Sequence, residues 1–328
     1  MMTRHVCGLA LALSQVAVVA AQTAAPTERA VTVGAAPGLP GTLTLPAGAA
    51  RVPAVVLVHG SGPHDRDETV GVNKPFLDLA QGLAAQGIAV LRYEKRTKVA
   101  PLSFIGRRFT VDDEVVDDAL AAVQLLRKEP SIDPARIVVV GHSLGGMLAP
   151  RIASRDPALA GIVLMAGATQ QSLPDMITTQ FAYLATLPGA DTVALAAALR
   201  PLVEALPRLR AITAADTANT TPIAGAPASY WFDLARYDIV ATTRSLTQPV
   251  LVLQGERDYQ VRSEDVTAWE RALGPRPGLT VKRYAALNHL FMAGEGASSP
   301  AEYVVPGHVE QEVIDDLARW VLALPRRG

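Results

Sequence analysis

The sequence predicts an α/β fold in which a mostly parallel central sheet is covered by helices on both faces. Short runs of apolar, often β-branched residues alternate with helical segments along most of the chain. These runs are nearly all apolar, as expected for strands that are buried on both sides. Between about residues 169 and 245 the strand-like runs disappear and alanine- and leucine-rich helical stretches replace them. We therefore expect one domain, residues 22–328, whose sheet carries a helical cap insertion.

The individual elements follow from periodicity and from turn residues. Residues 30–33 and 41–45 alternate around Gly38 and Pro40, which is typical of an antiparallel hairpin at a sheet edge. Apolar runs predict further strands at residues 53–58, 88–93, 137–140, 161–165, 249–254 and 280–284. Helical periodicity predicts helices at residues 75–86, 111–128, 144–154, 264–273 and 309–324. Within the insertion, residues 192–206 are helical, and we expect breaks at Pro188, Pro201, Pro207 and Pro222.

Composition limits the classes of function. Of 328 residues, 49% are hydrophobic and 19% are charged, so the chain can bury a substantial core. The net charge of −1 gives no reason to expect nucleic acid or an anionic membrane as a partner. No spacing of cysteine and histidine is typical of a metal site, so no metal is expected. The oligomeric state is not indicated.

The N-terminal segment, residues 1–21, has the features of a secretory signal peptide. Arg4 and His5 precede an almost wholly apolar stretch, and small residues up to Ala21 mark the expected cleavage site. A membrane anchor is the alternative, but the apolar run is shorter than the ~20 residues that a span needs. The sole cysteine, Cys7, lies in this segment. We expect a periplasmic or secreted protein that has no disulfide and no stable membrane insertion.

The feature that carries chemistry is the turn after the strand at residues 137–140. There the segment Gly141-His142-Ser143-Leu144-Gly145 has the form G-x-S-x-G and leads into a helix. Strand, tight turn and helix are the context of a nucleophile elbow, which exposes the Ser143 hydroxyl above the sheet. An ordinary glycine-rich turn is the alternative, which the buried strand and the additional Gly146 disfavour. We expect His142 to pack beneath the elbow.

A serine hydroxyl needs a base to take its proton and a third group to orient that base. Catalytic groups in open α/β sheets gather at the carboxyl ends of the strands. Asp258 follows the strand at residues 249–254, and His289 follows the strand at residues 280–284. The sequence therefore predicts a triad of Ser143, Asp258 and His289.

Other residues could fill two of these roles. Glu256 and Asp265 are alternatives for the acid, because both lie near the same strand end. His308 is an alternative base, although its place at the start of the last helix favours a surface or capping role.

The oxyanion hole requires two amide donors. The first is expected to be the backbone amide of Leu144, which follows the nucleophile. The second should come from the loop after the strand at residues 53–58, where Ser61 is our prediction and Gly62 is the alternative.

These motifs resemble the α/β-hydrolase superfamily. Within it, they resemble bacterial carboxylesterases related to the catalytic domains of prolyl-oligopeptidase-type, S9-like serine peptidases. The resemblance covers residues 41–46, 59–67, 73–76, 87–93, 141–146, 255–258 and 288–289. It implies a cofactor-free serine esterase that acts on a small-molecule ester. The sequence departs from the pattern of such proteins in two ways. No β-propeller precedes the domain, which disfavours an oligopeptidase function. Glu94 stands where such proteins commonly have aspartate. For Asp65, Arg66 and Asp67 we expect a brace of paired charges.

The predicted function is the hydrolysis of a carboxylic ester through an acyl-enzyme intermediate. A peptidase or amidase with the same triad is the alternative among enzymes. A non-catalytic binding module with the same fold is the other alternative, which the presence of all three triad residues disfavours.

The insertion should cover the carboxyl edge of the sheet, because both of its ends join strands on that side or close to it. Its aromatic residues are then candidates for an acyl pocket. They are Phe181, Tyr183, Tyr230, Trp231 and Phe232. The alternative for each is that it only packs the insertion against itself.

Overall fold

The computed structural model describes residues 25–48, 51–168 and 173–327, in which eight strands form one sheet in the order β1-β2-β4-β3-β5-β6-β7-β8. Strand β2 pairs antiparallel with β1 and β4, and every other pairing is parallel. The strands are β1 Thr27–Val33, β2 Leu39–Leu45, β3 Val52–Val58, β4 Ala89–Tyr93, β5 Ile132–His142, β6 Gly161–Met165, β7 Val250–Gly255 and β8 Leu279–Tyr284. The predicted mostly parallel sheet with an antiparallel edge hairpin is confirmed.

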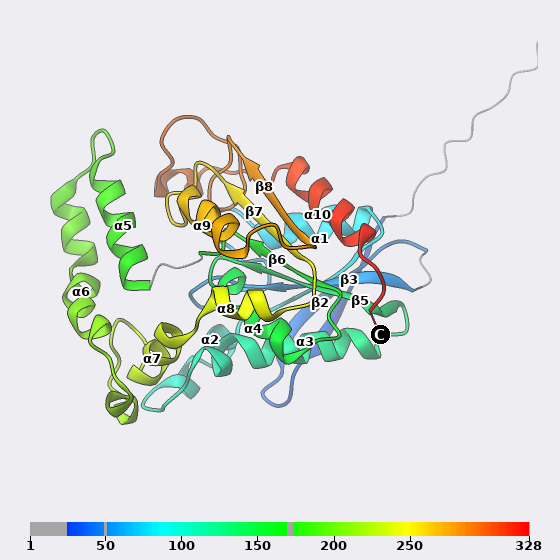
Figure 1. The fold of residues 1–328 in the computed structure, drawn as a ribbon, viewed down its shortest axis with the longest axis horizontal. Coiled ribbons are helices and arrows are strands. Elements are labelled where there is room, and N and C mark those ends of the chain that lie inside the picture. Colours follow the sequence, from blue (N-terminus) through cyan, green and yellow to red (C-terminus); the bar gives the residue numbers. More distant parts are fainter. Residues whose placement is uncertain (1–24, 49–50, 169–172, 328) are drawn as a thin grey trace, which may run out of the picture.

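Helices cover both faces of this sheet (Figure 1). One face carries α1 (Pro75–Ala85) and α10 (Gln311–Ala323). The other carries α3 (Asp117–Lys128), α4 (Leu144–Arg155), α8 (Ile239–Ser245) and α9 (Ser263–Leu273). Strand β3 shows why its sequence is apolar throughout, since Val55 and Leu57 pack on the first face while Val56 and Val58 pack on the second. Both apolar layers are thus filled by alternate residues of the same strands.

Several short elements connect these layers. The predicted helix at residues 111–128 begins with a π-helical turn, η2 (Asp112–Val116), before continuing as α3. The others are α2 Arg96–Val99 and the 3₁₀ turns η1 Pro101–Phe104, η3 Ala214–Ala218 and η4 Pro300–Val304.

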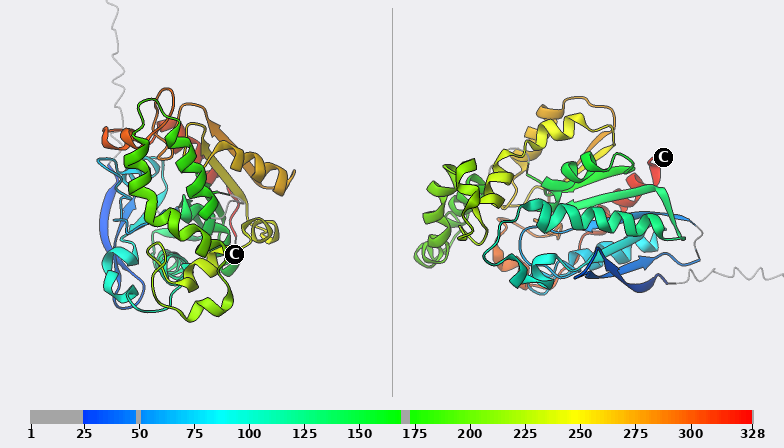
Figure 2. Two further views of the ribbon diagram at one scale, coloured as in Figure 1. Left: turned by 90° about the vertical axis from the view of Figure 1, so that its left-hand side faces the viewer. Right: turned by 90° about the horizontal axis from the view of Figure 1, so that it is seen from below.

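The helical insertion forms a cap at one end of the molecule (Figure 2). It contains α5 (Leu173–Ala185), α6 (Thr192–Arg210) and α7 (Ala228–Arg236). The last helix of the expected insertion, α8, instead packs against α4 and α9 and so belongs to the helical layer on the sheet. The cap proper therefore ends with α7.

The prediction that Pro201 and Pro207 break the helix at residues 192–206 is wrong, because α6 runs through both to Arg210. Each proline removes one N–H from the helix and leaves a carbonyl without its partner. Both prolines lie on the exposed side of α6, where water can satisfy those carbonyls. Pro188 and Pro222 lie between helices, as expected.

The expected signal peptide, residues 1–21, lies outside the described residues. Among the helices of the described part of the chain, none combines the length and the apolar character that a membrane span requires.

Candidate active site

Ser143 occupies a strained turn between β5 and α4. Its φ of 52° and ψ of −116° lie in a region that residues with a side chain rarely adopt. Its amide donates a hydrogen bond to the carbonyl of Met165 at 2.9 Å, which fixes the turn to the neighbouring strand. A Cβ on Gly141 would lie 2.1 Å from the Gly145 carbonyl oxygen, and one on Gly145 would lie 2.2 Å from that of Val58. The two glycines of the motif are therefore required by close backbone contacts.

The structure brings Asp258 and His289 together at the same edge of the sheet. The Nδ1 atom of His289 lies 2.6 Å from Oδ2 of Asp258, and both residues are buried. The other carboxylate oxygen of Asp258 accepts hydrogen bonds from the amides of Gln260 at 2.7 Å and Val261 at 2.9 Å. The carboxylate is thus held in place by the turn that follows β7, and it can fix the tautomer of His289.

The position of the histidine is set by the loop after β8. Asn288 accepts hydrogen bonds from the amides of Leu290 at 3.0 Å and Met292 at 3.2 Å, and its amide nitrogen donates to Glu302 at 2.9 Å. These contacts make the loop a compact turn that holds His289 toward the elbow.

His289 lies beside the nucleophile. Its ring centroid is 4.6 Å from that of His142, the residue directly before Ser143. As expected, His142 is buried beneath the elbow. Among the described residues no hydrogen bond joins the Ser143 hydroxyl to His289. In many enzymes without substrate this bond is long, and it tightens only in the substrate complex.

The alternative acid and base residues lack this arrangement. Glu256 is exposed, and Asp265 lies in the first turn of α9. His308 is exposed and contacts Asp78 at 2.9 Å, away from the elbow. The geometry therefore favours Asp258 and His289, whose catalytic roles stay predictions.

In the loop after β3, the carbonyl oxygens of two successive residues already accept hydrogen bonds from side chains. The ammonium of Lys95 donates to the Gly60 carbonyl at 2.7 Å, and Nε2 of His64 donates to the Ser61 carbonyl at 2.7 Å. In a trans peptide the N–H points opposite to the C=O. The amide of Ser61 therefore points away from Lys95. The amide of Leu144, the first of α4, has no partner within the helix. Both can serve the predicted oxyanion hole.

The segment at residues 65–67 in the same loop, whose charges alternate, is held by ion pairs and hydrogen bonds. Arg66 contacts Glu94 at 3.0 Å, and Asp67 forms an ion pair with the buried Arg92 of β4. Asp65 accepts hydrogen bonds from Thr69 and so closes a local turn. These contacts fit the expected brace, and Glu94 acts in it as a partner of Arg66.

Sequence reasoning did not assign a role to three buried charged residues around this loop. Glu68 is 1% exposed and Lys95 is 2% exposed, and Glu114, also buried, lies 2.9 Å from the Lys95 ammonium. Lys95 lies just after β4, at the carboxyl end of a strand, and this position could have indicated from the sequence that it belongs to the site. The burial of Glu68 and Glu114 had no signal in their local sequence.

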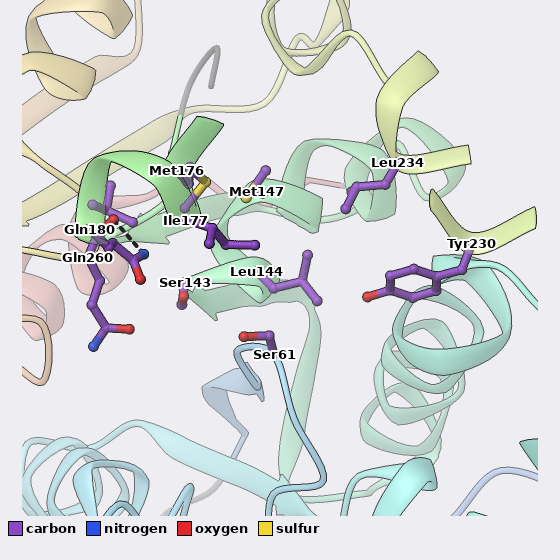
Figure 3. Close-up of a pocket in the computed structure, with 11 residues that line it drawn as sticks. Ser61, Ser143, Leu144, Met147, Met176, Ile177, Gln180, Tyr230, Leu234 and Gln260 are labelled. Carbon is purple, nitrogen blue, oxygen red and sulfur yellow. Dashed lines mark hydrogen bonds between the residues drawn. The ribbon is translucent and has the colours of Figure 1, made fainter. Parts of the chain in front are cut away.

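A cavity of about 220 Å³ opens beside Ser143 (Figure 3). Its lining residues are Ser61, Ser143, Leu144, Met147, Met176, Ile177, Gln180, Tyr230, Leu234, Gln260 and Val261. Met176, Ile177 and Gln180 come from α5, and Tyr230 and Leu234 come from α7, so the cap covers the carboxyl edge as expected.

Of the five aromatic candidates, only Tyr230 lines this cavity. Trp231 is buried and donates its indole N–H to the carbonyl of Ile223 at 2.6 Å, so it packs within the cap. Tyr183 donates its hydroxyl to Ser298 and stacks on Tyr259 at 5.7 Å between ring centroids. Phe181 and Phe232 are likewise not among the lining residues. Successive residues of a helix point in different directions, so neighbours such as Tyr230 and Trp231 face different surroundings.

Within the described residues no group of three or more histidine, cysteine, aspartate or glutamate side chains is placed to hold a metal ion.

Comparisons with known proteins identify the family of the chain. A model of the alpha/beta hydrolase family matches residues 55–305. Esterase EstD of Thermotoga maritima is 42% identical over 298 residues, which cover 90% of this chain and 67% of that protein. Among solved structures, an esterase of Pyrococcus furiosus aligns with a TM-score of 0.57 at 19% identity and covers 91% of both chains. The acylaminoacyl peptidase of Pyrococcus horikoshii aligns with a TM-score of 0.51 at 13% identity, covering 82% of this chain and 38% of that one.

The two structural matches show a shared fold, which includes the expected likeness to an S9-type peptidase domain. The family model spans the elbow, both strands that carry Asp258 and His289, and the whole cap. Together with the 42% identical relative, this match shows that the chain belongs to the α/β-hydrolase family.

Proposed function

We propose that the protein hydrolyses small carboxylic esters through an acyl-enzyme intermediate, with Ser143 as nucleophile. The observation that carries this proposal is the Asp258–His289 pair, held beside the strained Ser143, which lines a cavity. The identity of 42% with a relative described as an esterase supports the same reaction class.

In the first half of the reaction, the Ser143 oxygen attacks the ester carbonyl carbon while Nε2 of His289 takes the hydroxyl proton. Asp258 accepts the hydrogen bond from Nδ1 and stabilises the imidazolium that forms. The negative charge that develops on the carbonyl oxygen is stabilised by the amides of Leu144 and Ser61. The tetrahedral intermediate then breaks its bond to the alcohol, which leaves with the proton from His289.

In the second half, a water molecule replaces the alcohol. His289 removes a proton from this water as its oxygen attacks the acyl carbon, and the same two amides stabilise the oxyanion. The bond to Ser143 then breaks, the serine regains its proton from His289, and the carboxylic acid is released.

The cavity favours a short acyl chain. Its volume of about 220 Å³ is below the range of roughly 300–1,000 Å³ that is usual for drug-sized ligands. One side is apolar, formed by Leu144, Met147 and Leu234, and this side suits an acyl chain. The opposite side carries Gln180, whose amide donates to the Gln260 carbonyl at 3.0 Å, and is polar (Figure 3).

The test combines a fluorophosphonate probe with p-nitrophenyl acetate, butyrate, octanoate and palmitate, and with aminopeptidase substrates. We expect labelling of the wild type but not of Ser143→Ala, and faster hydrolysis of acetate and butyrate than of palmitate. Faster cleavage of the peptide substrates would make the protein a peptidase or amidase. Absence of both labelling and hydrolysis would refute the enzymatic proposal in favour of a binding module.

A further inference from the structure

We propose that Glu68 and His142, a buried ion pair beneath the elbow, are positioning residues that join the loop of Ser61 to the loop of His289. The inference rests on the proposed esterase function. It adds a protonated histidine to the site, distinct from the histidine that acts as base.

The first observation is the unusual state of Glu68. Its side chain is buried although a buried carboxylate is unfavourable without a partner, and its φ of 51° is a backbone conformation that favours glycine. A strained backbone conformation of this kind persists only where surrounding contacts hold it in place, and such residues are frequent at functional sites.

The second observation is a continuous line of contacts. The amide of Gly60 donates to Oε1 of Glu68 at 2.5 Å. Oε2 of Glu68 lies 3.0 Å from Nδ1 of His142. The Nε2 atom of His142 lies 2.9 Å from the carbonyl oxygen of His289. The line therefore runs from the residue before Ser61 to the backbone of the base.

The third observation concerns the protons of His142. With Glu68 ionised, both ring nitrogens of His142 face oxygens that can only accept, a carboxylate on one side and a carbonyl on the other. A neutral imidazole has only one N–H and would place a lone pair against one of these oxygens. The 3.0 Å contact lacks the angle of a regular hydrogen bond, and neither of its atoms has another hydrogen-bond partner among the described residues. An ion pair between imidazolium and carboxylate explains the close approach of these buried atoms.

The surrounding charges agree with this assignment. Burial alone lowers the pKa of His142, but the charge of Glu68, the contacts to Glu68 and the His289 carbonyl, and the charge of Asp258 outweigh burial and raise it. Burial alone raises the pKa of Glu68, but His142, together with His59 and His64, lowers it to about 2. The ring of His289, which is also titratable, packs against His142 with 4.6 Å between ring centroids.

The pair can act on catalysis because both of its ends are parts of the reaction site. A Cβ on Gly60 would lie 3.1 Å from Cβ of Ser143, so the loop has little room to move on that side. Loss of the ion pair would weaken one contact of the Gly60 loop and one contact of the His289 backbone together, although Lys95 and Asn288 still hold these two loops. A displacement of about 1 Å at reacting groups can lower a rate by roughly 100-fold.

The first experiment is ¹⁵N NMR of the histidine side chains, with His142→Gln used to assign the His142 signals. We expect both ring nitrogens of His142 to be protonated at neutral pH in the wild type and one of them to lose its proton in Glu68→Gln. A neutral His142 in the wild type would overturn the assignment.

The second experiment separates positioning from folding. Glu68→Gln and His142→Gln should lower kcat for p-nitrophenyl butyrate by roughly 10- to 100-fold with little change in KM, and should slow fluorophosphonate labelling to a similar degree. The matched control is Asp156→Asn. It also disrupts a buried carboxylate–cation pair, with Arg127 at 2.6 Å, but lies at the far end of α4. It should lower the melting temperature and leave kcat unchanged.

The outcomes distinguish this proposal from the esterase proposal. If the wild type reacts with the probe but hydrolyses no ester, the esterase proposal fails, and the labelling rates of the variants still decide the positioning role. If either variant keeps wild-type rates, or loses no more rate than Asp156→Asn, Glu68 and His142 have no positioning role. If Glu68→Gln does not fold, His142→Gln and the wild-type spectrum decide the question.

Discussion

Replacing Lys95 by methionine tests whether the oxyanion loop is oriented from behind by a buried charge. The Lys95 ammonium donates to the Gly60 carbonyl at 2.7 Å and lies 2.9 Å from a carboxylate oxygen of Glu114. Because the Gly60 carbonyl and the Ser61 amide belong to the same peptide group, the contact fixes the direction of the Ser61 N–H. Methionine keeps an unbranched side chain of similar length and removes only the charge and its donors.

Two effects of known size should follow. Removing Lys95 leaves the buried carboxylate of Glu114 without the ammonium that neutralises it, and loss of one partner of a buried ion pair costs about 3–5 kcal/mol of stability. Complete loss of one oxyanion donor lowers kcat by roughly 10²- to 10³-fold, or about 2.7–4 kcal/mol. Here the loop keeps the contact of the Gly60 amide with Glu68 and the contact of the Ser61 carbonyl with His64. The donor should therefore be misaligned but not lost, and we expect a decrease in kcat nearer to 10- to 100-fold.

The double variant Lys95→Met with Glu114→Leu separates the two effects. It removes the whole ion pair, and replacing both partners by apolar side chains is often neutral for stability. The melting temperature should recover, while kcat for p-nitrophenyl butyrate should stay low. Glu114→Gln alone is the matched control, because it keeps the contact between Lys95 and Gly60 and should lose stability with little change in kcat. If the double variant recovers kcat together with its melting temperature, Lys95 is structural and our account of the Ser61 amide is wrong.

Four further predictions concern the triad, the cap, acid stability and export. Ser143→Ala and His289→Ala should each lower kcat by several orders of magnitude with little effect on stability; near-normal turnover of His289→Ala with loss of activity in His308→Ala would show that the base is misassigned. Tyr230→Ala should change the preference among p-nitrophenyl ester chain lengths, whereas its neighbour Trp231→Ala should lower the melting temperature and leave that preference unchanged; the reverse result would contradict the described cavity. Burial lowers the pKa of His59 from 6.5 to about 3, so between these values the unfolded chain binds a proton that the folded chain does not. The free energy of unfolding should then fall by up to about 1.4 kcal/mol for each unit of decreasing pH. Urea unfolding of the wild type can measure this slope from about pH 6.5 down to 4.5, a range in which buried carboxylates such as Glu68 do not yet contribute. A His59→Gln variant with an equal slope would refute the assignment. Finally, we propose that export removes residues 1–21, so that protein from the periplasm or medium of a bacterial host has an intact mass that begins at Gln22; protein of full mass in the membrane fraction would contradict this.

The sequence by itself was sufficient to predict the sheet and the candidate catalytic residues in their order along the chain. Apolar strands that are buried on both faces have a composition that hardly depends on their neighbours, so the central strands β3 to β7 were recognisable along the chain. The edge hairpin β1–β2 was recognisable from its alternating pattern and turn residues. The elbow is also a local feature, since Gly141 and Gly145 are required by backbone atoms within the turn and the adjacent strand. Asp258 and His289 could be selected because parallel strands end at one edge of the sheet.

Helix boundaries inside the cap were less predictable. A proline breaks a helix when its freed carbonyl is buried, but Pro201 and Pro207 lie on an exposed side of α6, which continues through both. The exposure of a helix side depends on where the helix packs, and local sequence does not contain that information.

Only the tertiary structure decided which side chains surround the elbow. Tyr230 faces the cavity and Trp231 does not, because the orientation of α7 depends on how the cap packs over the sheet edge. Glu68, Lys95 and Glu114 come from three separate segments, and in the sequence each resembles an ordinary surface charge. Their importance arises from burial, which removes water and leaves each charge dependent on partners distant in the chain. Sequence pattern thus determined the groups proposed to react, and three-dimensional packing determined the groups that hold them in place.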